Sequence, residues 1–183
     1  HADTPALEVL QEVATSGRAS RLYTRLVKTQ KANSVGAWIG PGSRFPRLFF
    51  FSAEPPEGTS TDELEAGLLA EIEKLKTEPP TTEELQRVIT QYRAGTLRSL
   101  KSNLGLALEL SDYQALSGDW HNLFRDIERV SAVKSEQVTA VAAKYLIRQN
   151  CTIGRLVPTA AAGAPPPKPR DAGPRTILGV PVK

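Results

Sequence analysis

The sequence predicts an α+β fold, with a small, mostly antiparallel sheet and helices packed mainly on one face of it. Two observations favour this class. Within residues 17–40, an apolar stripe at helical spacing changes, after Lys31, to an alternation of apolar residues with small or polar ones. Between residues 60 and 146, apolar residues recur at helical spacing instead. A helix that leads directly into a strand, followed by a run of helices, is typical of an α+β domain.

The composition indicates one globular domain. The chain has 183 residues, of which 40% are hydrophobic and 23% charged. Its formal net charge of +3 is too small to indicate nucleic-acid binding by itself. No apolar run approaches the roughly 20 residues that a membrane-spanning helix needs. The single cysteine, Cys151, excludes an intramolecular disulfide, and its position in a predicted strand indicates a buried apolar residue.

The first elements are predicted from caps and periodicity. Thr4 is the predicted N-cap of a first helix, with Pro5 in its first turn, and Thr15-Ser16-Gly17 ends this helix. A short amphipathic helix follows, with Leu22 and Leu26 on its apolar side and three cations on its solvent side, namely Arg21, Arg25 and Lys28. Two strands, around 35–39 and 47–53, are expected to pair as an antiparallel hairpin. Because residues 48–51 are all apolar, the second strand is expected to be covered on both faces.

Helices dominate the remainder of the chain. Two capping boxes, Ser60–Glu63 and Thr81–Glu84, each predict a helix start. Further helices are expected at 102–118, 120–129 and around 138–145, before a closing strand at 151–157. The domain is therefore assigned to residues 1–157. The Pro- and Ala-rich residues 158–183 are predicted to form a flexible or extended tail, since they cannot bury enough apolar surface to offset the entropy of ordering.

Several short motifs, in this order and spacing, carry a resemblance to a known family. They are Asp3 to Leu7, Ser20 to Tyr23, Leu26-Val27, Ser34-Val35, Pro79 to Leu85, Asp112 to Asp119 and Val138 to Leu146. Together they resemble the C-terminal domain of pitrilysin/insulinase-type zinc peptidases, most closely the bacterial members built as two homologous halves. In that family further strands precede the position of His1. The resemblance therefore implies a fragment, or one chain of a larger protein.

The resemblance also implies where the zinc lies. The family binds zinc through an inverted H-x-x-E-H helix and a distant Glu. This sequence has two histidines, His1 and His121, and no such motif. We therefore expect no cofactor in this chain, zinc in a homologous partner half, and an extended peptide enclosed between the halves. Whether the parent protein is an enzyme stays open. The bacterial resemblance suggests the periplasm or cell envelope.

The family's C-terminal half also contributes an Arg and, seven positions later, a Tyr that hold the substrate and its developing oxyanion. The corresponding positions here are Val27 and Ser34. Val27 has no donor and Ser34 is too short, so the resemblance implies a non-catalytic half or an inactive partner subunit. Arg25 is near enough to replace the missing Arg, and Asn33 adjoins the Tyr position. These four residues are the candidate substrate contacts.

Two other functions remain open from the sequence. One is nucleic-acid binding by a basic stripe with nearby aromatic residues, made of Arg18, Arg21, Arg25, Lys28, Lys31, Tyr23 and Trp38. The alternative interpretation of the stripe is the solvated side of an ordinary helix. The other function is that of a purely structural interaction subunit.

Overall fold

In the computed structural model, the described residues are 1–42, 45–156, 176–177 and 180–181. The chain divides into two compact units, His1–Ile153 and Gly154–Lys183. The elements of the first unit are α1 (Thr4–Thr15), the π-helical turn η1 (Tyr23–Val27), β1 (Ser34–Gly40), β2 (Leu48–Glu54), α2 (Thr61–Thr77), α3 (Thr82–Ser99), α4 (Asn103–Ser117), α5 (Asn122–Ser131), α6 (Ser135–Tyr145) and the 3₁₀ turn η2 (Arg148–Asn150). In the second unit, β3 (Thr176–Ile177) and β4 (Val180–Pro181) pair antiparallel.

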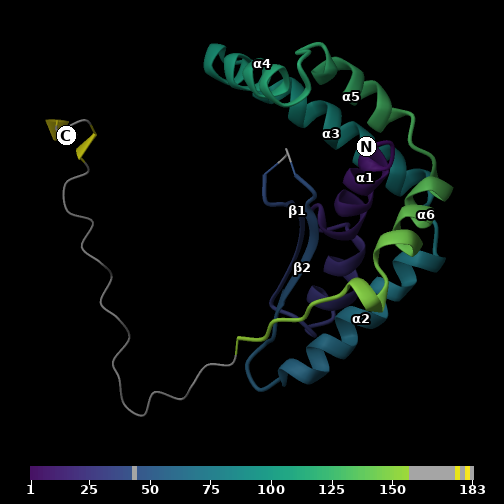
Figure 1. Cartoon of the computed structure of the whole chain (residues 1–183). Helices are drawn as coiled ribbons and strands as arrows, with labels where there is room; N and C mark the ends of the chain where they lie inside the picture. The colour runs from purple at the N-terminus through teal and green to yellow at the C-terminus, as the bar shows by residue number, and fades with distance from the viewer. Residues whose placement is uncertain (43–44, 157–175, 178–179, 182–183) are drawn as a thin grey trace. The chain divides into compact units, whose positions relative to one another are not determined.

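The sheet of the first unit is a two-stranded antiparallel hairpin, and the helices lie on one side of it (Figure 1). Its register runs from the pair Ser34–Glu54 to the pair Gly40–Leu48. The apolar side chains of one face pack on the core, namely those of Val35, Phe49, Phe51 and Ala53. The α+β class, with helices on one face, is thus confirmed.

The other face of the hairpin carries exposed apolar side chains. Trp38 is 45% exposed and Leu48 is 61% exposed. The expectation that the second strand is covered on both faces is therefore wrong. Its inward-facing residues pack on the core, but no described helix lies against the outward-facing ones.

Helix α1 forms the centre of the core. It packs against β1 on one side and against α3, α5 and α6 on the other. Its stripe of buried residues consists of Ala6, Val9, Leu10, Val13 and Ala14. Because these residues recur at helical spacing and Pro5 occupies the first turn, the sequence predicts both the helix and its buried side. The predicted cap is wrong by one residue, since Asp3 is the N-cap and Thr4 is already helical.

The predicted helix starts are confirmed at both capping boxes. Ser60 with Glu63 and Thr81 with Glu84 each make the two reciprocal hydrogen bonds. Helix α3 ends at Ser99 and α4 begins at Asn103; in the first turn of α4, an added Cβ on Gly105 would overlap the Ser99 carbonyl oxygen. Only glycine allows the first turn of α4 to approach the end of α3 so closely.

The predicted closing strand is wrong for residues 151–156, which form no strand, while residue 157 lies outside the described part. A strand is stable only when its backbone groups pair with a neighbouring strand, and no described strand pairs with this segment. Cys151 is exposed, so its predicted burial is also wrong. Of the predicted tail, only β3 and β4 are among the described residues.

Candidate functional site

The candidate residues lie on the connection from η1 to β1. Lys28 N–H donates to the Tyr23 carbonyl oxygen over 2.8 Å, which closes a wider turn than that of an α-helix. Gln30 then adopts a left-handed conformation with φ of 59° and turns the chain toward the sheet. Single π-helical turns are frequent at functional sites, and the candidate residues lie in and just after this one.

Val27 and Ser34 lie in different surroundings. Val27 packs partly buried against the core and offers no polar atom to a ligand. Ser34 is exposed at the start of β1, where its Oγ donates to Glu54 Oε2 over 3.2 Å. Asn33 binds the same end of the hairpin, through its side chain to the Pro55 carbonyl and its backbone N–H to the Glu54 carbonyl. Asn33 and Ser34 thus fasten the end of the sheet.

Arg25 is held in ion pairs with helix α2. Its Nη1 lies 3.0 Å from Glu71 Oε2, and its Nη2 lies 2.7 Å from Glu78 Oε2. Glu71 also pairs with Lys74 over 2.7 Å. Burial would lower the pKa of Arg25, but the hydrogen bonds to Glu78 and Glu71 outweigh it and raise the pKa. These pairs give Arg25 a structural role, while its substrate contact stays a prediction.

Arg21 was predicted to lie on the solvent side of its helix, and that prediction is wrong. Instead of facing solvent, it is 7% exposed. Its Nε and Nη2 bind both oxygens of Glu84, over 2.9 and 2.8 Å. Its Nη1 and Nη2 also donate to the carbonyls of Glu78 and Pro79. The hydrogen bond from Arg21 lowers the pKa of Glu84 to about 2. No sequence signal pointed to this pair, because its partners are 63 residues apart.

The basic stripe is therefore interrupted. Arg21 and Arg25 are bound to carboxylates of this domain, whereas Arg18, Lys28 and Lys31 are exposed. Because the charges of these two arginines are already paired, they would attract a phosphate backbone only weakly. The geometry thus favours the interpretation of the stripe as one side of an ordinary helix.

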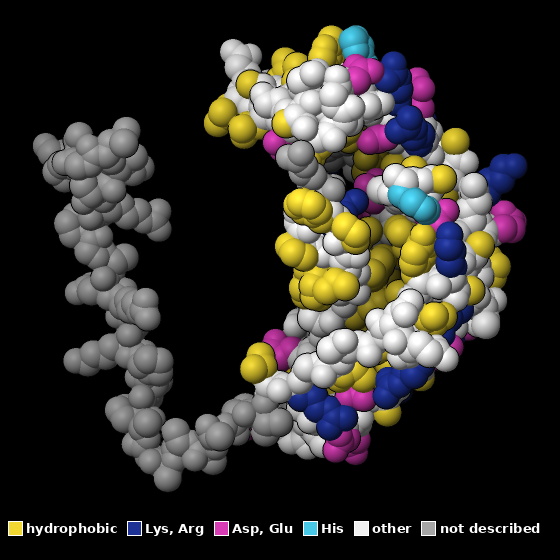
Figure 2. Space-filling model, viewed as in Figure 1, with side chains coloured by type: hydrophobic (Ala, Val, Ile, Leu, Met, Phe, Trp, Pro, Cys, Tyr) yellow, Lys and Arg dark blue, Asp and Glu magenta, His cyan; other side chains and the backbone are white. Residues whose placement is uncertain are grey.

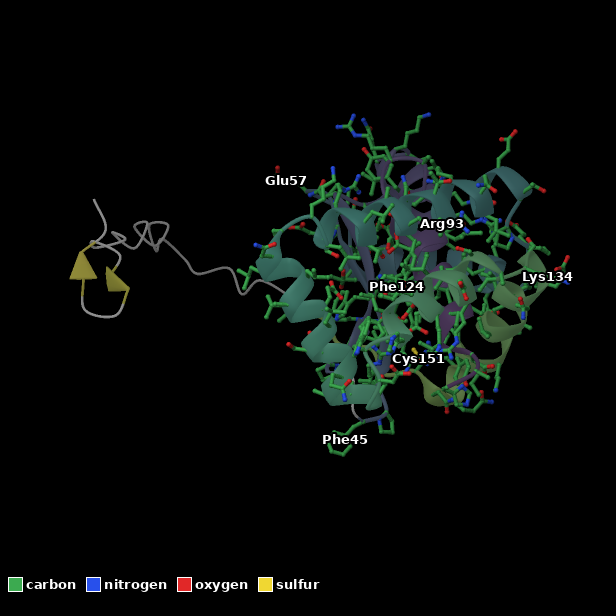
Figure 3. The ribbon with its side chains drawn as sticks, turned by 90° about the horizontal axis from the view of Figure 1, so that it is seen from above. Phe45, Glu57, Arg93, Phe124, Lys134 and Cys151 are labelled. Atoms are coloured by element: carbon green, nitrogen blue, oxygen red, sulfur yellow. The ribbon has the colours of Figure 1, made fainter. Side chains whose placement is uncertain are left out.

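An exposed aromatic pair lies on the outer face of the sheet. Trp38 of β1 and Phe50 of β2 are cross-strand partners, with ring centroids 5.0 Å apart and planes inclined by 11°. Hydrophobic side chains are visible over these strands and on α4 in Figure 2. Phe45, at the end of the hairpin loop, is 77% exposed and protrudes from the domain (Figure 3). Sequence reasoning missed the pair because the partners are paired only through the register.

The histidines behave as surface residues. His121 Nδ1 lies 2.7 Å from Asp119 Oδ1, and its ring stacks on Trp120. His1 Nδ1 accepts from the backbone N–H of Asp3. Within the described part of the chain, no three His, Cys, Asp or Glu side chains are placed to hold a metal ion.

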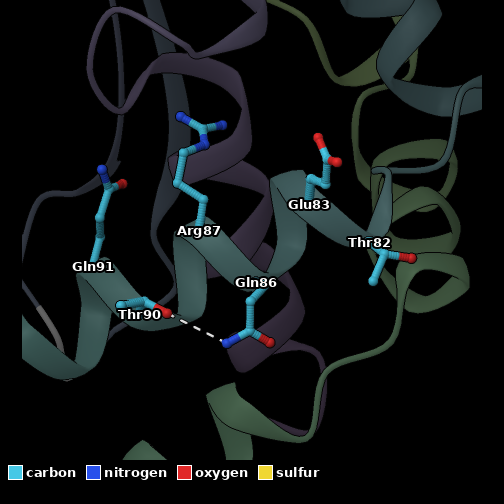
Figure 4. A pocket seen from close by; sticks show the side chains of 6 residues that line it. All are labelled: Thr82, Glu83, Gln86, Arg87, Thr90 and Gln91. Atoms are coloured by element: carbon cyan, nitrogen blue, oxygen red, sulfur yellow. Dashed lines mark hydrogen bonds between the residues drawn. The ribbon is translucent and has the colours of Figure 1, made fainter.

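A shallow depression lies on the surface of α3. It is lined by polar side chains that include Gln86 and Thr90, whose side chains lie 3.4 Å apart (Figure 4). No candidate substrate contact lines it. Among the described residues, no helix is both long and apolar enough to cross a membrane.

Comparison with known proteins adds a family and related structures. Residues 1–92 match the family described as the peptidase M16 inactive domain. A candidate zinc protease of Bordetella pertussis Tohama I is 30% identical, with 86% of this chain and 87% of that chain covered and a TM-score of 0.76. No curated protein is similar enough in sequence to be matched.

Two further solved structures are similar. The inactive peptidase domain of a candidate zinc protease from Bordetella parapertussis is 29% identical, with 91% and 88% of the two chains covered and a TM-score of 0.79. The periplasmic protease PqqL of Escherichia coli shares the fold at 16% identity and a TM-score of 0.62. That match covers 79% of this chain but only 16% of PqqL.

Proposed function

This chain belongs to the peptidase M16 family, as an inactive domain, and from that premise we propose that it is the non-catalytic half, or inactive partner subunit, of a pitrilysin-type zinc metallopeptidase. In this proposal a homologous half supplies the zinc, and this chain supplies part of the wall that encloses an unstructured peptide. The chain alone neither hydrolyses peptides nor binds zinc tightly.

The observation that carries the partner role is helix α4. None of its residues is buried, and four of its leucines are exposed: Leu104 by 70%, Leu106 by 37%, Leu108 by 57% and Leu116 by 50%. At 100° per residue, Leu104 and Leu108 lie on one side of the helix, and Leu106 and Leu110 lie on the opposite side. Exposed apolar side chains gathered in this way are typical of an interaction surface.

The site residues support a non-catalytic role for this chain. Val27 is packed against the core and Arg25 is bound to two carboxylates. Neither is placed as a free donor for an oxyanion, which an active site requires. The reaction then depends on an activated water at the zinc of the partner half. The fold shared with the periplasmic protease PqqL favours a periplasmic location in this proposal.

The proposal is tested by mixing the full chain with a zinc-bearing M16 half from the same source. We expect a stoichiometric complex in analytical ultracentrifugation and hydrolysis of an unstructured fluorogenic peptide by the complex. The double variant Leu104→Glu/Leu108→Glu is expected to weaken association at least tenfold, because it places two charges in the apolar surface. The control Phe45→Glu changes an equally exposed apolar residue on the hairpin loop and should leave association unchanged.

The outcomes separate the alternatives. If the two chains associate but the zinc-bearing half alone hydrolyses the peptide as fast as the complex does, this chain is a purely structural subunit. No association with the zinc-bearing half, or zinc-dependent hydrolysis by this chain alone, would contradict the proposal.

A further inference from the structure

The outer face of the β1–β2 hairpin is an ordered series of cross-strand pairs. Because side chains alternate between the faces of a strand, every second pair lies on this side. The pairs are, in order, Ser34–Glu54, Gly36–Ser52, Trp38–Phe50 and Gly40–Leu48. One aromatic pair is therefore bordered by small residues along β1.

Two glycines border Trp38 along β1, and the indole lies against Gly40, which is buried. A Cβ on Gly40 would lie 3.5 Å from Trp38 Cδ1, in direct contact with the ring. A Cβ on Gly36 would lie 2.8 Å from Ser52 Oγ, too close for any side chain there without movement. Larger residues at these positions would cover the platform formed by Trp38 and Phe50. The sequence instead exposes the stacked rings.

The size of the platform decides what it fits. A stable protein interface buries about 800 Å² on each partner. Two aromatic side chains bury at most about 150–250 Å² each, and the Phe50 ring is only partly exposed. These two rings by themselves therefore offer less area than a folded partner needs, and they suit one or two side chains of a bound segment.

The neighbouring pair adds a polar end to this surface. Ser34 and Glu54 lie two pairs along from Trp38 and Phe50, on the same face, and are both exposed. Ser34 is also one of the candidate substrate contacts. The aromatic platform is thus continuous, on a single sheet face, with the position where substrate contact is expected.

We propose that the outer face of β1–β2 is a peptide-contacting surface on which Trp38 and Phe50 seat a bulky apolar side chain, preferably aromatic, of an extended peptide. This inference rests on the proposed function, and it names the class of side chain that the wall selects. Aromatic pairs are more favourable than the burial of their area alone would make them. An aromatic side chain is therefore favoured over an aliphatic one of similar size.

The experiment measures peptide binding to the full chain by fluorescence anisotropy. The probe is an unstructured, dye-labelled decapeptide with one central Phe, compared with the same peptide carrying Ala. We expect the Phe peptide to bind at least fivefold more tightly. Trp38→Ala should abolish that difference, and Trp38→Leu, which keeps an apolar strand residue, should reduce it. The control Trp120→Ala removes the other exposed tryptophan, 40% exposed on the loop before α5, and should leave it unchanged.

The outcomes distinguish this inference from the proposed function. Equal binding of the two peptides, or an equal effect of Trp38→Ala and Trp120→Ala, would overturn the inference. Neither of these results would bear on the proposed function, which is tested separately by association with the zinc-bearing half. Loss of that association in Trp38→Ala would also overturn the inference, because the face would then be a subunit interface. Far-UV circular dichroism establishes that each variant is folded.

Discussion

Arg21 holds together two parts of the chain that are far apart in sequence. Its guanidinium joins the segment before η1 to the junction of α2 and α3, through Glu84 and two backbone carbonyls. A buried charge is tolerated only when its donors are satisfied, and this fork geometry satisfies each nitrogen. The cost of removing one partner is correspondingly high.

We therefore expect Arg21→Ala to lower the free energy of unfolding by about 3 kcal/mol, since it leaves the Glu84 carboxylate without its cationic partner and two backbone carbonyls without their donor. Urea denaturation monitored by circular dichroism measures the change. Arg18→Ala is the matched control, because Arg18 is an exposed arginine three residues earlier and its loss should cost at most about 0.5 kcal/mol. Equal effects of the two substitutions would show that the buried ion pair does not stabilise the domain.

The same pair predicts a pH dependence. Arg21 lowers the pKa of Glu84 from its usual 4.5 to about 2, so the folded state favours the charged carboxylate. That stabilisation is present above about pH 5 and is lost as the pH falls from 4.5 towards 2. Because the Glu84 side chain is 22% exposed, solvent screening reduces the contribution to about 1–2 kcal/mol.

Between pH 5 and pH 2, wild type should therefore lose about 1–2 kcal/mol more stability than Glu84→Gln, which cannot titrate at this position. Urea titrations at several pH values give the slope. Glu83→Gln removes the same charge at an exposed neighbouring position and should keep the wild-type slope. A Glu84→Gln slope equal to that of wild type would contradict the assignment.

At the scale of elements, local chemistry made most of the helices predictable. The capping boxes at Ser60 and Thr81 need only four residues each, so the sequence determines them directly. The pairing of β1 with β2 followed from two short alternating segments close together in the chain. These features depend on neighbours within a few residues.

The errors concern features that depend on distant partners. Cys151 has the local sequence of a strand residue, but no described strand pairs with its segment, so it is exposed. Arg21 has the spacing of a solvent-facing cation, but Glu84 provides a buried partner 63 residues away. The Trp38–Phe50 pair likewise requires the register, which periodicity alone does not give. The candidate residues could be assigned to one stretch of the sequence without these contacts, but the surface around them could not be described.

At the scale of the whole molecule, the buried apolar residues delimit the domain. In the described part of the chain, all of them lie between Ala6 and Ala142. The largest fully buried side chains include Leu10 of α1, Leu22 before η1 and Leu75 of α2. The predicted domain of residues 1–157 contains every one of these residues. The remaining residues, 158–183, are the Pro- and Ala-rich ones that composition predicts to be a tail.

A chain ending at residue 157 should therefore keep the free energy of unfolding of the full chain to within about 0.5 kcal/mol, because no known core contact is removed. Urea denaturation and far-UV circular dichroism measure stability and helix content. As a positive control, a chain ending at Ser131 loses α6 with its buried Val138, Val141 and Ala142, and this chain should not fold. A loss of more than about 2 kcal/mol on ending at residue 157 would mean that the C-terminal segment contributes to the core, and the domain boundary would then lie beyond it.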